Sequence, residues 1–122
     1  MLIQFCKSKI AYATITKAEL YYEGSLTIDA EFLDKTGIMP GEKVEVLNVN
    51  NGSRIETYAI AGEPGSGVIC LNGPAAHSGR VGDQVIILSY AFMTPEEAGK
   101  FKTKIIHLDK NNKVKMLLGS QN

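Results

Sequence analysis

Much of this chain consists of short stretches in which apolar and polar residues alternate, separated by turns that contain glycine. A period of two places the apolar side chains on one face of a β-strand. Strands are predicted at 9–16, 26–28, 44–49, 55–61, 68–71, 84–90, 104–108 and 113–117. Many short strands with few helices favour a mainly β fold, a small β-barrel with a few short helices.

The helices and turns have local signals of their own. Asp29 is a good N-cap for a short helix that Gly37 ends, and Thr94-Pro95 begins a second helix with a capping hydroxyl and a proline at its first position. Asn51-Gly52 predicts a hairpin with a type I′ turn, which needs positive φ at both residues. Asn111-Asn112 predicts the turn between the last two strands. We expect 119–122 to form a loose tail.

Length and charge limit the function. At 122 residues the chain is predicted to be a single domain, 1–122, and its 13 basic and 13 acidic residues give zero formal net charge. Binding to nucleic acids or anionic membranes needs clustered positive charge, so neither partner is expected. No apolar run approaches the roughly 18 residues of a membrane span. We therefore predict a soluble, cytoplasmic protein.

The sequence predicts no metal site. Its two cysteines, Cys6 and Cys70, form no CxxC motif, and neither lies at ligand spacing from His77 or His107. Both cysteines flank apolar residues, and we expect them to be buried free thiols.

Four Gly-Ser pairs occur in the chain, and most must be turns, because glycine reaches positive φ without steric cost. Gly24-Ser25 differs in its setting, since Tyr22-Glu23 precedes it and a set of polar residues follows downstream. Gly24 has no Cβ, so the Ser25 hydroxyl could approach the preceding carbonyl. From the residues alone, Gly24-Ser25 could be an ordinary turn.

The polar residues downstream of Ser25 could bind a ligand, but each also has an ordinary structural explanation. Arg54 could bind a carboxylate with two parallel hydrogen bonds, although it could equally be a surface charge. From the residues alone, Tyr58 is expected to be a packed aromatic residue on a strand. The small residues of Asn72-Gly73-Pro74-Ala75-Ala76 would let a ligand approach backbone amides, but the same segment could be a turn that ends a strand.

Taken as a set, these motifs are specific. They are Tyr-Glu-Gly-Ser at 22–25, Asn-Gly-x-Arg-x-x-Thr-Tyr-Ala-Ile at 51–60, Asn-Gly-Pro-Ala-Ala at 72–76 and Val-Gly-Asp at 81–83. Over about 9–90 the chain resembles the pyruvoyl-dependent aspartate 1-decarboxylases. The resemblance implies a double-psi β-barrel and the conversion of L-aspartate to β-alanine and CO₂, which feeds pantothenate and coenzyme A synthesis.

The resemblance also implies that the chain cuts itself between Gly24 and Ser25. Thr57 would stabilise the oxyanion of the first step, and Ser25 would become a covalently bound pyruvoyl cofactor that forms a Schiff base with the substrate. Residues 1–24 would form a small chain and 25–122 a large one. Tyr58 would donate the proton that replaces the lost carboxylate. Whether cleavage is spontaneous or needs a helper protein stays open.

The remaining site residues follow from the same resemblance. The substrate-binding residues would be Lys9, Arg54, Thr57, Asn72, Gly73, Pro74 and Ala75. On a regular strand Arg54 and Tyr58 share one face while Thr57 points to the other. A site that uses all three needs an irregular strand or two subunits, and the resemblance implies the second, in a homotetramer.

A non-catalytic β-barrel that only binds a partner is the alternative from another class, because double-psi barrels host unrelated functions. A gel would separate the two hypotheses, since the enzyme would run as two fragments and the binding module as one chain.

Overall fold

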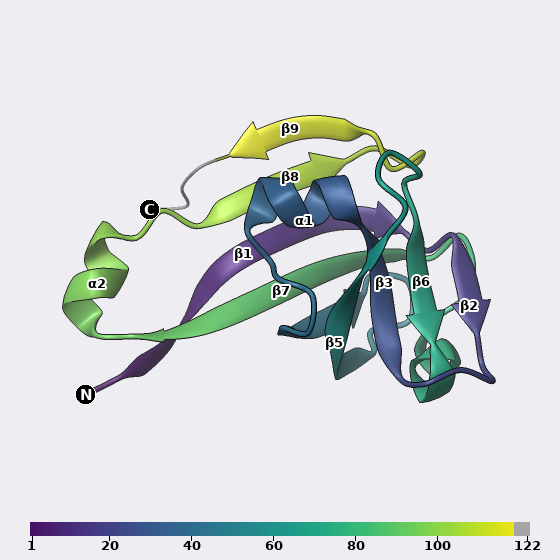
Figure 1. The fold of residues 1–122 in the computed structure, drawn as a ribbon, viewed down its shortest axis with the longest axis horizontal. Coiled ribbons are helices and arrows are strands. Elements are labelled where there is room, and N and C mark those ends of the chain that lie inside the picture. The colour runs from purple at the N-terminus through teal and green to yellow at the C-terminus, as the bar shows by residue number, and fades with distance from the viewer. Residues whose placement is uncertain (119–122) are drawn as a thin grey trace.

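A computed structural model describes residues 1–118 (Figure 1). The strands are β1 (Ile3–Thr14), β2 (Lys17–Glu19), β3 (Ser25–Asp29), β4 (Lys43–Asn48), β5 (Arg54–Gly62), β6 (Ile69–Asn72), β7 (Gln84–Met93), β8 (Lys104–Leu108) and β9 (Val114–Leu118). Two short helices, α1 (Ala30–Thr36) and α2 (Pro95–Lys100), and the 3₁₀ helix η1 (Gly73–Ser78) complete the elements. The mainly β class with a few short helices is confirmed.

The strands pair in the order β2-β6-β3-β5-β4-β7-β1-β8-β9. Since β2 follows β1 after only Ile15 and Thr16, the two act as one interrupted strand, and six strand positions close into a ring. In Figure 1 the long strands β1 and β7 cross behind β3, β5 and β6, while β8 and β9 lie along one side. The predicted small barrel is therefore present, extended by a hairpin.

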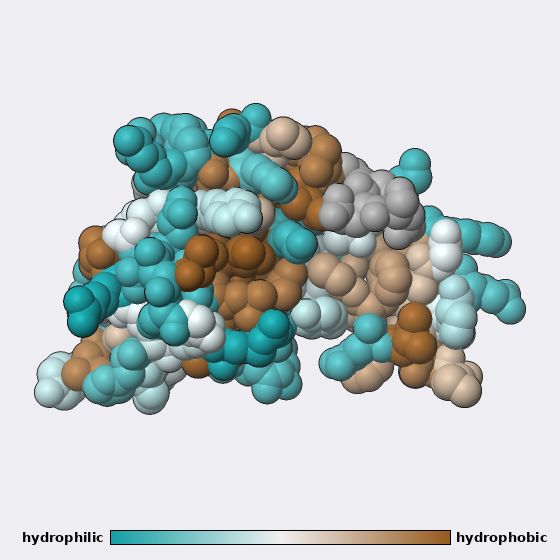
Figure 2. Space-filling model, turned by 180° about the vertical axis from the view of Figure 1, so that it is seen from behind, coloured by the Kyte–Doolittle hydropathy of each residue, from teal (hydrophilic) through white to brown (hydrophobic). Residues whose placement is uncertain are grey.

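The interior of the barrel is filled by the side chains that point inward from each strand. Ile10, Leu26, Ile28, Ile69 and Ile87 are fully buried. Strand β5 alternates between exposed and less exposed positions along most of its length, as its sequence predicts. Apolar side chains also reach the surface, and Figure 2 shows hydrophobic atoms gathered across the middle of the face seen from behind.

Both predicted helix caps are confirmed. The Asp29 carboxylate accepts a hydrogen bond from the Glu31 amide, and Gly37 ends α1 with φ of 74°. Thr94 and Glu97 form a reciprocal capping box at the start of α2. The carboxylate of Asp29 also accepts from the amides of Gly65 and Gly67, so the residue that ends β3 fixes the loop before β6.

The type I′ turn predicted at Asn51-Gly52 is wrong, although the hairpin of β4 and β5 exists. Only Gly52 has positive φ, at 78°, and the loop runs over 49–53. The carboxamide oxygen of Asn48 accepts from the amides of Asn50 and Asn51, and the Asn48 carbonyl accepts from the Gly52 amide. These bonds stabilise a wider turn than the two-residue loop that the Asn-Gly signal favours.

Strand β1 begins earlier than predicted, at Ile3 rather than Lys9, and it carries a bulge where Tyr12 has φ of 62°. The predicted tail at 119–122 lies outside the described residues. None of the described helices combines the length and the apolar character needed to cross a membrane.

Candidate active site around Ser25

Ser25 is the first residue of β3 and is 1% exposed, whereas the preceding Gly24 lies at the surface. Antiparallel pairing of β3 with β6 sets Ser25 directly opposite Asn72. The Asn72 carboxamide donates a hydrogen bond of 2.9 Å from Nδ2 to Ser25 Oγ. The structure thus holds a buried serine hydroxyl in a fixed place beside an exposed peptide bond.

Two further residues complete this polar patch. Thr27 lies opposite Cys70 in the same strand pair, and Thr27 Oγ1 accepts the second hydrogen bond of Asn72 Nδ2, also at 2.9 Å. Cys70 Sγ lies 3.2 Å from Asn72 Oδ1 and donates to it. Burial raises the pKa of the Cys70 thiol, so the proton that it donates is retained. Sequence reasoning assigned no role at the site to Thr27 or Cys70, because only the β3–β6 register brings them to Ser25.

A surface cavity of about 260 Å³ lies beside Gly24. It is lined by Gly24, Ile55, Glu56, Thr57, Pro74, Ala75 and Ser78. The Thr57 hydroxyl has no hydrogen-bond partner among residues 1–118, so its proton is available to a group in the cavity. Four of the predicted site residues therefore line this one cavity: Gly24, Thr57, Pro74 and Ala75.

Gly73 is packed tightly against the segment before Ser25. It has φ of 66°, and a Cβ added to it would lie 2.5 Å from the Tyr22 carbonyl oxygen and 2.9 Å from the Gly24 nitrogen. A side chain here would push the Tyr22–Gly24 backbone away. Gly73 thus contributes to the site by close approach of two backbones.

The far end of η1 is clamped by the β4–β5 hairpin. The Ser78 carbonyl accepts hydrogen bonds from the side chains of Asn48, Asn51 and Ser53 at 3.0–3.1 Å. This clamp fixes the short helix that carries Pro74 and Ala75 against the cavity. The Asn-Gly signal predicted a turn here, but it did not predict that the turn's side chains would hold another element.

Tyr58 lies on the same face of the barrel as Ser25. In the parallel pair of β3 and β5, Leu26 lies opposite Ala59, and both point into the core. The residues before them, Ser25 and Tyr58, therefore both point outward. Tyr58 is 40% exposed, and its hydroxyl has no partner within the described part of the chain.

Arg54 is on the same outer face but is already paired. Its Nη1 donates to Glu45 Oε1 at 2.6 Å, and the same oxygen accepts from the Tyr90 hydroxyl at 3.1 Å. Burial, and then the hydrogen bond to Glu45, raise the pKa of Tyr90. Arg54 is four residues from Tyr58 along β5, which corresponds to about 13 Å.

Lys9 lies on β1, on another strand of the barrel wall. It is in register with Leu88, which is in register with Glu45, so the three share the outer face. Around the closed barrel, β3 is reached from β1 either through β7, β4 and β5 or through β2 and β6. Within residues 1–118, neither Lys9 nor Arg54 forms a hydrogen bond or an ion pair with Ser25 or Asn72.

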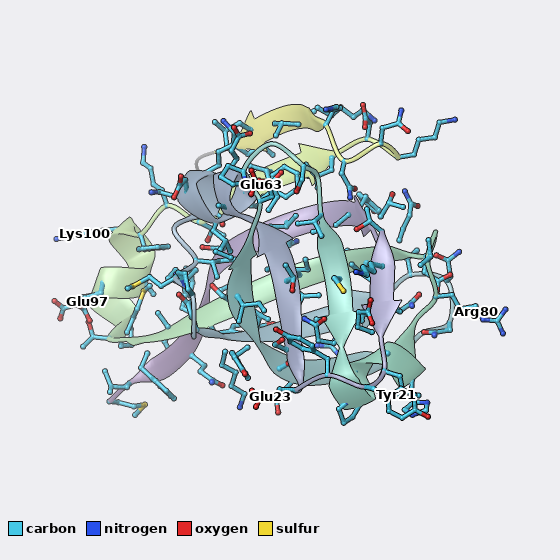
Figure 3. The ribbon with its side chains drawn as sticks, turned by 45° about the vertical axis from the view of Figure 1, so that its right-hand side comes forward. Tyr21, Glu23, Glu63, Arg80, Glu97 and Lys100 are labelled. Carbon is cyan, nitrogen blue, oxygen red and sulfur yellow. The ribbon has the colours of Figure 1, made fainter. Side chains whose placement is uncertain are left out.

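The loop from β2 to β3 runs past the site at the edge of the barrel. Figure 3 shows Tyr21 and Glu23 on this loop, both at the lower ends of the strands, where β3 begins. The loop is exposed, and Tyr21 and Tyr22 are 96% and 60% accessible. The segment before the Gly24-Ser25 bond is thus accessible from solvent while the serine itself is not.

The fold and site define a small β-barrel protein with a buried serine hydroxyl next to an exposed peptide bond and a cavity. The family model described as aspartate decarboxylase matches residues 1–115. The chain belongs to the aspartate decarboxylase family.

Individual relatives agree with this assignment. The aspartate 1-decarboxylase of Listeria welshimeri is 56% identical over 110 residues, covering 90% of this chain and 87% of that protein. The aspartate 1-decarboxylase of Chloroherpeton thalassium is 52% identical over 117 residues, covering 96% and 86%. Among solved structures, the rationally designed mkDPBB_sym_86 protein is 22% identical, with a TM-score of 0.48, covering 63% of this chain and 90% of that one.

Proposed function

We propose that this chain is a cytoplasmic, pyruvoyl-dependent aspartate 1-decarboxylase, which converts L-aspartate to β-alanine and CO₂ for pantothenate and coenzyme A synthesis. Membership of the aspartate decarboxylase family supports the reaction. The single structural observation that carries the proposal is the hydrogen bond from Asn72 to the buried Ser25 Oγ, next to the exposed Gly24.

In the first step Ser25 cleaves its own chain. Ser25 Oγ attacks the Gly24 carbonyl carbon, a C–O bond forms, the C–N bond to the serine nitrogen breaks, and the hydroxyl proton passes to the freed amine. Thr57 lines the cavity beside Gly24 and donates a hydrogen bond to the oxyanion of this step. The product is an ester between Gly24 and the Ser25 side chain.

The second step frees the two chains. Loss of the Ser25 α-proton and breakage of the Cβ–Oγ bond release residues 1–24 as a carboxylate and leave dehydroalanine at position 25. Its hydrolysis consumes one water, releases one ammonia and leaves a pyruvoyl group at the start of 25–122.

The surroundings fit this group. Residue 25 is buried and bounded by the Asn72 carboxamide, and a cavity lies beside the preceding Gly24. A pyruvoyl group supplies an electron sink for the negative charge left when the α-carboxylate of aspartate departs as CO₂. Tyr58, outward-facing on the same side as residue 25, then donates its proton to the former α-carbon.

The substrate carboxylates need cations, and Arg54 and Lys9 are the candidates. In this protomer the Arg54 guanidinium is already paired with Glu45, and Lys9 lies on β1, which does not pair with β3. We infer that neighbouring protomers of a homotetramer supply them. On the other side, the substrate would contact the segment Asn72, Gly73, Pro74 and Ala75.

Two measurements test this function. Purified protein given L-aspartate should release CO₂ and form β-alanine, and Ser25→Ala should form none; β-alanine made by uncleaved protein would refute the mechanism. Sedimentation equilibrium should give a species near four times the 13.2 kDa chain mass. A fully active monomer would refute the shared site.

A further inference from the structure

We propose that Cys70 and Thr27 are positioning residues, which hold the Asn72 carboxamide with one N–H on Ser25 Oγ and thereby set the rate of chain cleavage. This inference rests on the proposed self-cleavage at Gly24-Ser25. It concerns two side chains that take no direct part in the reaction.

The four residues form a compact square on two paired strands. Ser25 lies opposite Asn72 and Thr27 opposite Cys70, and residues two apart on a strand share a face. Ser25, Asn72 and Cys70 are each under 5% exposed. The intervening residues, Leu26 and Leu71, belong to the apolar core on the other face. The polar groups of the square can therefore be satisfied mainly by one another.

The Asn72 carboxamide is satisfied on both sides. Its two N–H groups go to Ser25 Oγ and Thr27 Oγ1, and its oxygen accepts from the Cys70 thiol. Turned by 180°, the carboxamide would place its oxygen toward the two hydroxyls and its N–H groups toward sulfur. Hydroxyls donate and accept equally well, so Ser25 and Thr27 fit either orientation.

The thiol is the group that distinguishes the two orientations. Sulfur is a weak acceptor, whereas a protonated thiol can donate to the carboxamide oxygen. Burial raises the pKa of Cys70, and this keeps the thiol protonated. The charged groups that act on the Cys70 thiol are Lys17 and Glu19, which form an ion pair with each other on β2. The thiol thus favours the orientation in which an N–H faces Ser25.

That orientation matters for the attack by Ser25. An N–H donated to Oγ stabilises negative charge as the hydroxyl loses its proton and leaves that proton free to transfer. A carboxamide oxygen in the same place would hold the proton and repel the developing charge. Cys70 would therefore act on cleavage through Asn72, without touching the bond that breaks.

Cys70→Ala and Cys70→Ser form a matched pair, because alanine and serine are close in size and only serine can donate to Asn72 Oδ1. Each protein is purified in the cold and then warmed, and the fraction cleaved is followed by intact mass. We expect Cys70→Ser to cleave within about threefold of wild type, and Cys70→Ala to cleave about tenfold more slowly, the upper range for one lost hydrogen bond. Equal rates for the two variants would overturn the inference.

A second pair guards against a folding defect. Thr27→Val keeps the side-chain shape but loses the acceptor for Asn72, and it should cleave more slowly than wild type. Thr27→Ser keeps the acceptor, and it should cleave near the wild-type rate. Unfolding midpoints, measured in an uncleavable Ser25→Ala background, should agree within each pair. If Cys70→Ala and Thr27→Val both cleave at the wild-type rate, the positioning role is wrong while the proposed function stands. Wild-type protein that stays intact would refute both.

Discussion

Gly73→Ala should nearly abolish chain cleavage, and the structure gives the size of the effect. A Cβ at this position would lie 2.5 Å from the Tyr22 carbonyl oxygen, against an ordinary contact of at least 3.4 Å. The segment that ends in Gly24 must then move by close to 1 Å. A displacement of about 1 Å between reacting groups can cost on the order of a hundredfold in rate.

The same substitution also strains the backbone, and a control separates the two effects. Gly73 has φ of 66°, and a left-handed conformation costs a non-glycine residue roughly 1–2 kcal/mol. Gly41 has φ of 89° and nothing within 4 Å of an added Cβ, so Gly41→Ala introduces the strain without the clash. Gly41→Ala should lose roughly 1–2 kcal/mol of unfolding free energy, and Gly73→Ala should lose at least as much.

The assay is the time course of cleavage by intact mass, with stability measured by urea unfolding in the Ser25→Ala background. Only Gly73→Ala should slow cleavage, by about a hundredfold. Wild-type cleavage by Gly73→Ala, or an equal loss in Gly41→Ala, would refute the reasoning that close backbone packing at Gly73 places the bond.

Three further predictions follow from the site. Thr57→Val should impair cleavage, whereas Tyr58→Phe should cleave normally and lose turnover by about 10²–10⁴-fold; normal turnover in cleaved Tyr58→Phe would mean that another group donates the proton. Arg54→Lys keeps the charge but loses the planar fork, and kcat/KM for aspartate should fall about ten- to a hundredfold; unchanged kinetics would make Arg54 a surface charge. The pKa of Asp83 is lowered by hydrogen bonds from the Asn48 side chain and the Arg80 amide. Its stabilising contribution is therefore complete above its unfolded pKa and lost as the pH falls through the lower folded pKa, so Asp83→Asn should weaken the acid dependence of stability below about pH 4; an identical pH profile would contradict this.

The sequence predicted those features that depend on neighbouring residues. Asp29 and Gly37 cap α1 as expected, and the alternation in β5 placed Thr57 and Tyr58 on opposite faces before the fold was known. Such signals are local, because a cap or a strand period acts over a few residues. The family resemblance added the identity of the site residues, which periodicity alone does not provide.

The remaining features depend on pairing between distant strands. Cys70 and Thr27 join the site only through the register of β3 with β6, and no local pattern encodes that register. The close approach of Gly73 to Tyr22 likewise arises from tertiary packing. At Asn51 the local turn signal was overridden, since the Asn48 side chain stabilises a wider loop. Long-range contacts therefore decided the site features that sequence reasoning missed, whereas the contacts that reshape the turn are local.

Ser25 is proposed to cut the chain and become the cofactor, and intact mass spectrometry of the purified protein distinguishes a cut chain from an uncut one. We expect two chains, residues 1–24 and 25–122, with the larger one lighter than a serine-started peptide by one ammonia. Ser25→Ala should give a single chain of full mass. A catalytically active wild-type protein with the mass of the uncut chain would contradict the account.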